Sequence, residues 1–360
     1  MSNELVQADG TSITLYSSDM APLVESALAD AYHMLQSSLP FFKFFRSLEN
    51  THCYIARRDA GTSTCPGTVL LFTCRKRRVD VLNEMIEIDR AELERFVSCI
   101  FTNFKTVDII NFKALKAATD GFRFPVQQHA SKDTYVIALP ETPEQYTSSI
   151  GKSTRANIRA QTNGLHRHFP SFKSLFFTNA EITEEHIRAI IGFSEKKIHA
   201  KGVAFAYDVG RITRLARECG FVNIFSIDGR ICAGSINYRV GASYFGEVTG
   251  YDSDYEKFGL GKLCVHQTIC ESIARGGKKF YLGGGVFDFK QRMLGEVLGM
   301  DELHIYRSSF KKWTHADVAA RALAVAHVRR LKKMLHQKKQ EKWAKLVFKS
   351  AYFIQNKLNK

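Results

Sequence analysis

The chain has 360 residues, of which 45% are hydrophobic, and it carries a formal net charge of +15. This length predicts two domains, or one large one, with enough apolar sequence to bury a core. No apolar run reaches the length of about eighteen residues that suits a transmembrane helix, and residues 1–10 lack the features of a secretory signal, so we expect a cytoplasmic protein.

The first half of the chain alternates helical and extended patterns. Residues 21–46 place apolar side chains at roughly helical spacing, and a β-rich stretch follows. Asp89 is a candidate N-cap for a helix over 91–104. The extended segments predicted in this half are 52–58, 68–76, 79–88, 107–112 and 134–139.

The second half repeats that order. Thr183 is predicted to cap a helix over 184–202, a shorter helix covers 209–219, and Asp228-Gly229 predicts a tight hairpin. Strands are expected over 222–227, 231–240 and 243–252, followed by a helix over 262–275 and a strand over 278–284. The sequence thus predicts two copies of one α/β unit, over 1–139 and 140–310, and a helical tail over 311–360.

The segment between the strand 243–252 and the next helix carries the clearest chemical signal. Its residues are Phe258, Gly259, Leu260, Gly261 and Lys262. Glycines let the backbone turn tightly, and the free N–H groups and dipole at a helix start favour an anion such as a pyrophosphate. A turn that merely starts a helix is the alternative, and the full G-x-G-x-x-G of a dinucleotide site is missing.

This segment resembles the acyl-CoA motif (Q/R)-x-x-G-x-(G/A) of GNAT acyltransferases, with Glu256 in place of the Gln or Arg. Residues 136–161, 250–263 and 283–295 also resemble, in order, motifs of the BioF-like and CelD-like acetyltransferases and of FemAB-type transferases. In the last of these motifs Phe289 replaces a Tyr and Lys290 is retained.

This resemblance spans about 140–295 and implies tandem GNAT-like units with mixed central sheets flanked by helices. It also implies transfer of an acetyl or acyl group from acetyl-CoA, or another acyl-CoA, to an amine or hydroxyl. Some members of the group are linked to cellulose or exopolysaccharide production, which suggests a sugar or polysaccharide precursor as acceptor. The second unit, which holds the glycine segment, is expected to bind the donor.

In a GNAT reaction the acceptor attacks the thioester directly, so the site needs a base, a stabilised oxyanion and a proton for the leaving thiolate. Glu247 is the candidate base, because an acid in an apolar strand needs a partner or a task. Lys290 is a candidate to polarise the thioester carbonyl, and Tyr281 to protonate the thiolate. A solvent-facing acid, a surface lysine and a packed tyrosine are the structural alternatives.

Five further residues are candidates for substrate binding: Arg155, Arg159, Tyr251, Asp252 and Tyr255. The two arginines are four residues apart on a predicted helix, so they share a face that suits an anionic acceptor. A solvated basic face, packed tyrosines and a loop-shaping aspartate are the alternatives.

No metal is expected, because the histidines do not cluster and the eight cysteines contain no C-x-x-C pair. The cysteines sit mostly in apolar runs, so reduced, packed thiols are predicted.

Residues 311–360 contain fourteen Lys or Arg and two acidic residues, so this tail carries +12 and the first 310 residues only +3. Its pattern is a basic amphipathic helix, which could bind an anionic membrane surface, contact nucleic acid or pack on the body. Apolar and aromatic residues such as Leu331, Trp343 and Phe348 favour a peripheral position at the inner face of a membrane.

Three hypotheses for function therefore stand. The first is the acyl-CoA-dependent transferase. The second is a FemAB-like aminoacyl transferase that uses charged tRNA, although the sequence shows no inserted coiled-coil hairpin of the kind those enzymes often carry. The third is a non-catalytic binding protein that acts through the tail, and it predicts that deleting 314–360 abolishes function.

Overall fold

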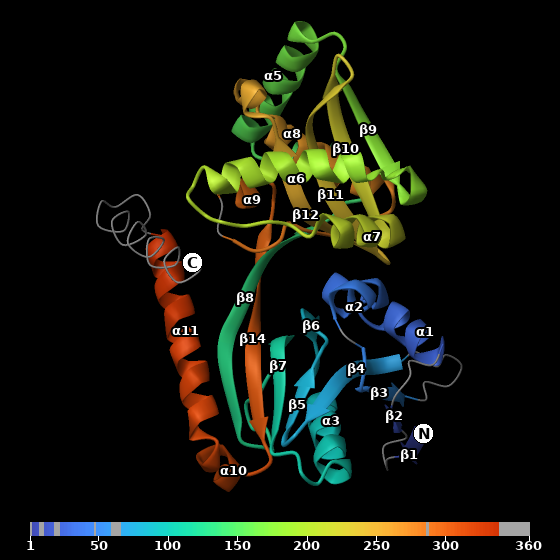
Figure 1. The fold of residues 1–360 in the computed structure, drawn as a ribbon, viewed down its shortest axis with the longest axis vertical. Coiled ribbons are helices and arrows are strands. Elements are labelled where there is room, and N and C mark those ends of the chain that lie inside the picture. Colours follow the sequence, from blue (N-terminus) through green and yellow to red (C-terminus); the bar gives the residue numbers. More distant parts are fainter. Residues whose placement is uncertain are drawn as a thin grey trace. The chain divides into compact units, whose positions relative to one another are not determined.

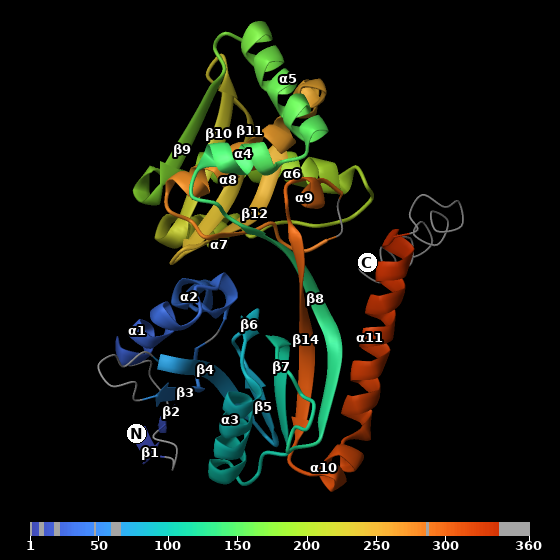
Figure 2. The ribbon, with the colours of Figure 1, turned by 180° about the vertical axis from the view of Figure 1, so that it is seen from behind.

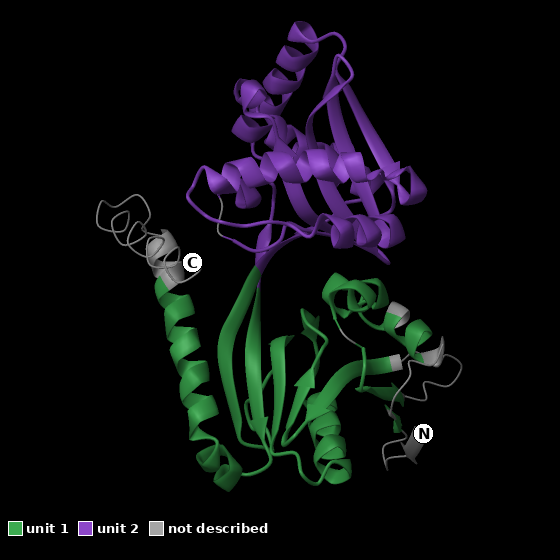
Figure 3. Cartoon of the chain, viewed as in Figure 1, with its two compact units in different colours: residues 1–133, 299–332 green, residues 134–298, 333–360 purple. Residues whose placement is uncertain are grey.

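The computed structural model describes residues 2–6, 11–17, 22–46, 48–58, 66–285 and 288–337. The chain forms two compact units, which we call unit 1 (residues 1–133 and 299–332) and unit 2 (residues 134–298 and 333–360) (Figure 3). Both contain mixed β-structure flanked by helices, which confirms the predicted α/β class (Figure 1).

Unit 1 has the strand order β1-β2-β3-β4-β5-β7-β14-β8. Its strands are β1 (Ser2–Val6), β2 (Thr11–Ser17), β3 (Thr51–Arg58), β4 (Pro66–Arg75), β5 (Arg78–Val81), β6 (Ile86–Glu87), β7 (Ile109–Lys116), β14 (Glu296–Tyr306) and the first part of β8 (Val126–Ala138). Its helices are α1 (Pro22–Ala31), η1 (Leu35–Ser37), α2 (Leu39–Phe45), α3 (Arg90–Asn103), α10 (Ser309–Thr314) and α11 (Ala316–Gln337). The core joins α3 to the sheet through edge-to-face contacts of Phe96 with Phe72 and Phe112.

In unit 2 the end of β8 is followed by β13-β12-β11-β10-β9. The strands are β9 (Lys173–Thr178), β10 (Gly220–Ile227), β11 (Arg230–Val240), β12 (Ser243–Tyr251) and β13 (Lys279–Tyr281). The helices are α4 (Pro143–Ser149), α5 (Lys152–His168), η2 (Asn179–Glu181), α6 (Glu184–His199), α7 (Val209–Cys219), η3 (Ser253–Phe258), α8 (Leu260–Ala274) and α9 (Asp288–Arg292). Helices α6 and α7 cover one face of this sheet, and α4 and α8 cover the other (Figures 1 and 2).

Local signals place several element boundaries correctly. The Asp89 side chain caps α3 by accepting a hydrogen bond from the Glu92 N–H at 2.8 Å. Thr183 caps α6 in the same way, and Asp228 and Gly229 both have the positive φ of a tight hairpin. These predictions are confirmed.

Residues 21–46 form two helices rather than a continuous one. His33 has a φ of 43°, which is incompatible with a continuing helix, and Ser38 caps α2 by accepting from the Phe41 N–H. A proline in the first turn of α2 also suits a new helix start.

The division into units differs from the predicted one. Residues 299–310 were expected in the second unit, but β14 pairs antiparallel with β7, with His304 opposite Asn111, and so belongs to unit 1. Helix α11 also belongs to unit 1 as far as residue 332, and residues 338–360, including Trp343 and Phe348, lie outside the described residues. None of the described helices combines the length and apolar character needed to cross a membrane.

Candidate active site

Strand β12 contains an extra residue where it pairs with β11. Ile236 lies opposite Val248, but the next residue, Asn237, lies opposite Gly246. Glu247 therefore has no partner on β11. A bulge of this kind bends the strand and redirects the side chain of the unpaired residue.

Glu247 lines a cavity of about 80 Å³ in unit 2. The wall is formed by residues of β11, β12, α8 and α9 and by residues in and just after β13. They are Ser235, Asn237, Gly246, Glu247, Thr249, Val265, Thr268, Phe280, Leu282 and Phe289.

Solvent can reach the Glu247 carboxyl, but the surrounding protein limits how well water solvates it. Its side chain is exposed, yet the protein around it displaces much of the water that would stabilise the charged form. This desolvation raises the pKa of Glu247 above its ordinary value. A carboxyl with a raised pKa is a stronger proton acceptor once ionised, as a general base requires.

A buried hydrogen-bond network holds the wall next to Glu247. The hydroxyls of Ser235 and Thr268 lie 2.8 Å apart, and Asn237 Nδ2 donates to Ser235 Oγ at 2.9 Å. Asn223 Nδ2 reaches Thr268 Oγ1 at 3.5 Å. All four residues are almost fully buried, so these bonds fix β10, β11 and α8 around the cavity.

Sequence reasoning missed Ser235, Asn237 and Thr268. A usable signal was present in β11, where Ser235 and Asn237 occupy alternate positions of an otherwise apolar strand and so share one face. Phe289, noted only as a substitution for Tyr in a motif, is exposed and lines the cavity.

Helix α8 begins at Gly259 without a side-chain cap. Gly259 has a φ of 64°, and its N–H bonds to Glu256 O at 3.0 Å. The N–H groups of Leu260 and Gly261 bond to no other described residue. Leu260 is fully buried and Gly261 is half-buried, so of these two donors only the Gly261 N–H belongs to a residue with solvent access at this positive end of a helix dipole.

Side chains of the protein itself occupy the space beside the two glycines. A Cβ at Gly259 would collide with the Gln161 side chain, and one at Gly261 would lie 2.7 Å from the Tyr251 ring. The absence of a Cβ thus admits α5 and Tyr251 to the helix start, whereas the sequence interpretation assigned this space to a ligand.

The three basic residues predicted to bind the donor or the acceptor differ in what they contact. Lys262 Nζ donates to Asn157 Oδ1 at 3.0 Å, next to the uncapped helix start. Arg155 donates to the carbonyls of Ser148 and Ile150, so it joins α5 to the end of α4. Arg159 is exposed on α5.

The residues that follow β12 shape the turn into α8. The Lys197 ammonium lies 3.3 Å from the centre of the Tyr251 ring. Asp252 caps η3 by accepting from the Asp254 N–H at 3.2 Å. Two further side chains from this segment pack against Phe169: Tyr255, with ring centres 5.5 Å apart, and the buried Phe258, at 5.2 Å.

The structure does not bring Tyr281 into the cavity with Glu247. Tyr281 is buried and stacks on Phe245 with ring centres 4.7 Å apart, whereas its neighbour Phe280 lines the cavity. Burial also raises the pKa of Tyr281.

Lys290 is buried and bound to backbone. Its Nζ donates to Gly283 O at 3.0 Å and to Gly284 O at 2.5 Å, and burial lowers its pKa to about 8. Lys290 therefore holds α9 to the glycine turn after β13, and this fixes the segment that carries Phe289.

Within the described residues, no group of three or more His, Cys, Asp or Glu side chains is arranged to hold a metal ion. The seven described cysteines are free thiols, and Cys65 lies outside the described residues.

Comparison with known proteins adds three findings. Residues 152–291 match the family model "Acetyltransferase (GNAT) domain". The structure of FemX matches with a TM-score of 0.59 at 8% identity, covering 83% of this chain and 99% of FemX. L-PGS from Bacillus licheniformis matches with a TM-score of 0.46 at 11% identity, covering 72% of this chain and 85% of that one.

A search of curated proteins finds no match. At 8% identity the FemX likeness shows the fold alone, while the family model covers the bulge, the uncapped helix and the cavity. Residues 152–291 are therefore similar to a GNAT acetyltransferase domain, within a chain whose fold is similar to that of FemX.

Proposed function

We propose that unit 2 transfers an acyl group from acyl-CoA to an amine or hydroxyl acceptor, with Glu247 as the general base. The observation that carries the proposal is the bulge in β12, which leaves Glu247 unpaired at a solvent-open cavity where desolvation raises its pKa. A base is what direct attack on a thioester requires, and no nucleophilic Cys or Ser is needed.

The proposed reaction removes one proton from the acceptor and adds one proton to the leaving thiolate. Ionised Glu247 accepts the proton of the acceptor amine or hydroxyl while that nitrogen or oxygen attacks the thioester carbon. The carbon–sulfur bond then breaks, and the departing thiolate takes up one proton and leaves as free coenzyme A. The product is an amide or an ester.

The start of α8 suits the diphosphate of coenzyme A. The N–H of the half-buried Gly261 bonds to no other described residue and lies at the positive end of the helix, and Lys262 adds a cation next to it. Because Leu260 is fully buried and Gln161 and Tyr251 fill the space beside the glycines, we assign the binding role to the Gly261 N–H and Lys262.

We also propose a positioning role for Lys290, since its ammonium is held by two carbonyls. For the acceptor we propose a sugar or polysaccharide precursor. The support is the resemblance of residues 136–161, 250–263 and 283–295 to CelD-like motifs.

The test is calorimetric titration with acetyl-CoA and longer acyl-CoAs, together with free-thiol release in the presence of amino sugars. We expect a donor to bind to the wild type, Lys262→Ala to weaken that binding, and Glu247→Gln to bind normally but release little thiol. Glu185→Gln, which changes an exposed carboxylate in the first turn of α6, is the matched control. No heat with any acyl-CoA would refute the proposal.

A second candidate is aminoacyl transfer from charged tRNA, which the likeness to FemX over 83% of the chain favours. The exposed Arg159 on α5 would then contact RNA phosphates. Binding of aminoacyl-tRNA by the wild type, with no heat from any acyl-CoA, would favour this candidate over the first.

A further inference from the structure

Helix α11 presents two different faces. Its inner face consists of small residues, with Ala322 buried and Ala319 and Ala326 half-buried. Residues three or four apart share a side of a helix, so these alanines form one stripe.

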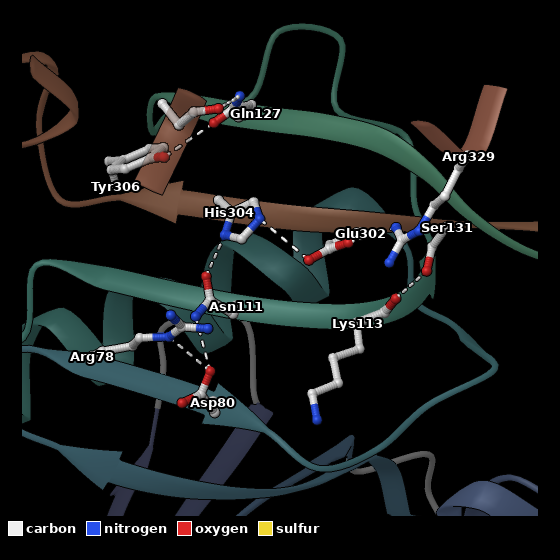
Figure 4. Close-up of polar contacts among 11 residues, drawn as sticks. Arg78, Asp80, Asn111, Lys113, Gln127, Ser131, Glu302, His304, Tyr306 and Arg329 are labelled. Atoms are coloured by element: carbon white, nitrogen blue, oxygen red, sulfur yellow. Dashed lines mark hydrogen bonds and ion pairs between the residues drawn. The ribbon is translucent and has the colours of Figure 1, made fainter. Parts of the chain in front are cut away.

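Polar contacts fix this inner face to the sheet (Figure 4). Gln127 Nε2 on β8 donates to Ala319 O at 3.0 Å. Arg329 donates to Glu302 on β14 at 2.8 Å, and Glu302 lies 3.5 Å from His304. The helix is therefore held without help from its outer face.

The outer face exposes large apolar side chains. Val328 is 50% exposed and Leu331 is 53% exposed, and with Ala320 and Ala324 they follow the spacing of a single helical stripe. Leu323 and Val325 are also exposed on this helix. An apolar stripe of this kind on a soluble surface marks a binding site.

Exposed aromatic rings precede this stripe in α10. Phe310 is 65% exposed and Trp313 is 74% exposed, with their ring centres 6.3 Å apart. Trp and other large aromatic residues favour the boundary between water and the apolar interior of a bilayer. The aromatic pair and the stripe therefore suit the same kind of partner.

Cationic residues flank the apolar stripe. Arg321 and Arg330 are exposed and form no ion pair with a described carboxylate. Residues 309–337 contain seven Lys or Arg and one acidic residue, Asp317. The partner of this face should therefore be anionic as well as apolar.

We propose that the outer face of α10 and α11 binds the surface of an anionic lipid bilayer. An α-helix of this length extends about 33 Å, and apolar side chains bordered by Arg and Lys are typical of helices that lie in the headgroup region. Each cation near such a surface adds to the attraction. Nucleic acid would use the cations but gives no role to Val328 and Leu331. No residue of α10 or α11 lines the Glu247 cavity, so this inference is independent of the proposed reaction.

The test is co-sedimentation of the full chain with vesicles of equal parts phosphatidylglycerol and phosphatidylcholine. We expect binding that weakens with salt, and a loss of about tenfold or more in affinity for Val328→Ser/Leu331→Ser. Arg321→Gln/Arg330→Gln should lose a similar amount. Leu175→Ser, which removes an equally exposed leucine from β9, is the control and should bind as the wild type does.

Three results would overturn the proposal. The first is equal binding to vesicles of phosphatidylcholine alone. The second is vesicle binding that survives the serine changes while a nucleic-acid duplex competes it away, which would identify a nucleic-acid surface. The third is a dimer in sedimentation that the serine changes dissociate, which would identify a second copy as the occupant. Far-ultraviolet circular dichroism of each variant checks that α11 is retained.

Discussion

The two units share an order of elements but begin one corresponding helix in opposite ways. In both, three antiparallel strands lead into a helix and then into a strand parallel to the third: β3-β4-β5-α3-β7 in unit 1 and β10-β11-β12-α8-β13 in unit 2. Helix α3 is capped by Asp89 and carries Glu92 in its first turn. Helix α8 has Gly259, no side-chain cap and no acid in its first turn. The positive end of α3 is thus neutralised by the protein itself, whereas α8 has no acidic side chain in its first turn to do so.

The two units also differ in how the protein surrounds their carboxylates. Burial alone would raise the pKa of Asp108, but Arg77, His315 and Lys311 around it lower that pKa to about 2. The nearby His304 ring and the Arg329 guanidinium likewise lower the pKa of Glu302 to about 2. Glu247 in unit 2 forms no ion pair with any residue that the structure describes, and desolvation raises its pKa. Paired carboxylates stabilise a fold, while an unpaired, poorly solvated one is available for proton transfer.

The largest expected effect is on the rate of acyl transfer when the unpaired Glu247 is replaced. Glu247→Gln should lower the rate of acyl transfer by about 10²–10⁴-fold, the usual contribution of a general base, and leave the dissociation constant of acyl-CoA unchanged. In the wild type the rate should rise with pH through the raised pKa of Glu247, because only the ionised form accepts a proton. The variant should lack this limb of the pH profile. Full activity in Glu247→Gln would show that the unpaired carboxylate of unit 2 is not the proton acceptor.

Lowering the pH should destabilise unit 1, because it protonates the paired carboxylates of Asp108 and Glu302. A lowered pKa stabilises the fold above the unfolded pKa of about 4, and this stabilisation is lost as the pH falls toward about 2. We expect a loss on the order of 1–2 kcal/mol for each of Asp108 and Glu302, since partly exposed cations are screened. Urea unfolding at pH 7 and pH 3, followed by far-ultraviolet circular dichroism, measures it. In Asp108→Asn/Glu302→Gln the difference between the two pH values should shrink, and an unchanged difference would contradict the assignment.

The third prediction concerns the open end of α8. Lys262→Ala should weaken acyl-CoA binding by about tenfold, as expected for one charge-assisted contact to a phosphate. Lys257→Ala is the matched control, because Lys257 is exposed two residues before Gly259. Equal losses in both variants would indicate general charge attraction instead of a contact at the helix start. Substitution of Gly259 or Gly261 is a poorer test, because it would displace Gln161 or Tyr251.

Features encoded by neighbouring residues could be predicted from the sequence. The caps Asp89 and Thr183 and the turn at Asp228-Gly229 each depend on a few adjacent side chains, and the structure places them as predicted. Helix α8 was predicted over 262–275, and it begins two residues earlier, at Leu260, inside the glycine segment.

Features that join distant segments could not be predicted. Strand β14 pairs with β7 across nearly two hundred residues, for example Leu303 with Phe112, and no local pattern specifies that partner. The bulge at Glu247 is a property of the pairing of β12 with β11. Gln161 beside Gly259 likewise depends on how α5 packs against α8. The candidate site depends on these nonlocal contacts more than the fold class does.

The smallest expected effect lies at the capped helix of unit 1. Asp89→Ala removes the acceptor for the Glu92 N–H and should lower the free energy of unfolding by about 1 kcal/mol, the usual cost of losing an N-cap. Asp89→Asn retains an acceptor oxygen and should lose much less. Acyl-CoA binding should be unchanged in both variants, because the donors assigned to the diphosphate lie on α8. If Asp89→Ala instead created a second acyl-CoA site in calorimetry, the cap alone would be what separates the two units, and the bulge at Glu247 would matter only for proton transfer.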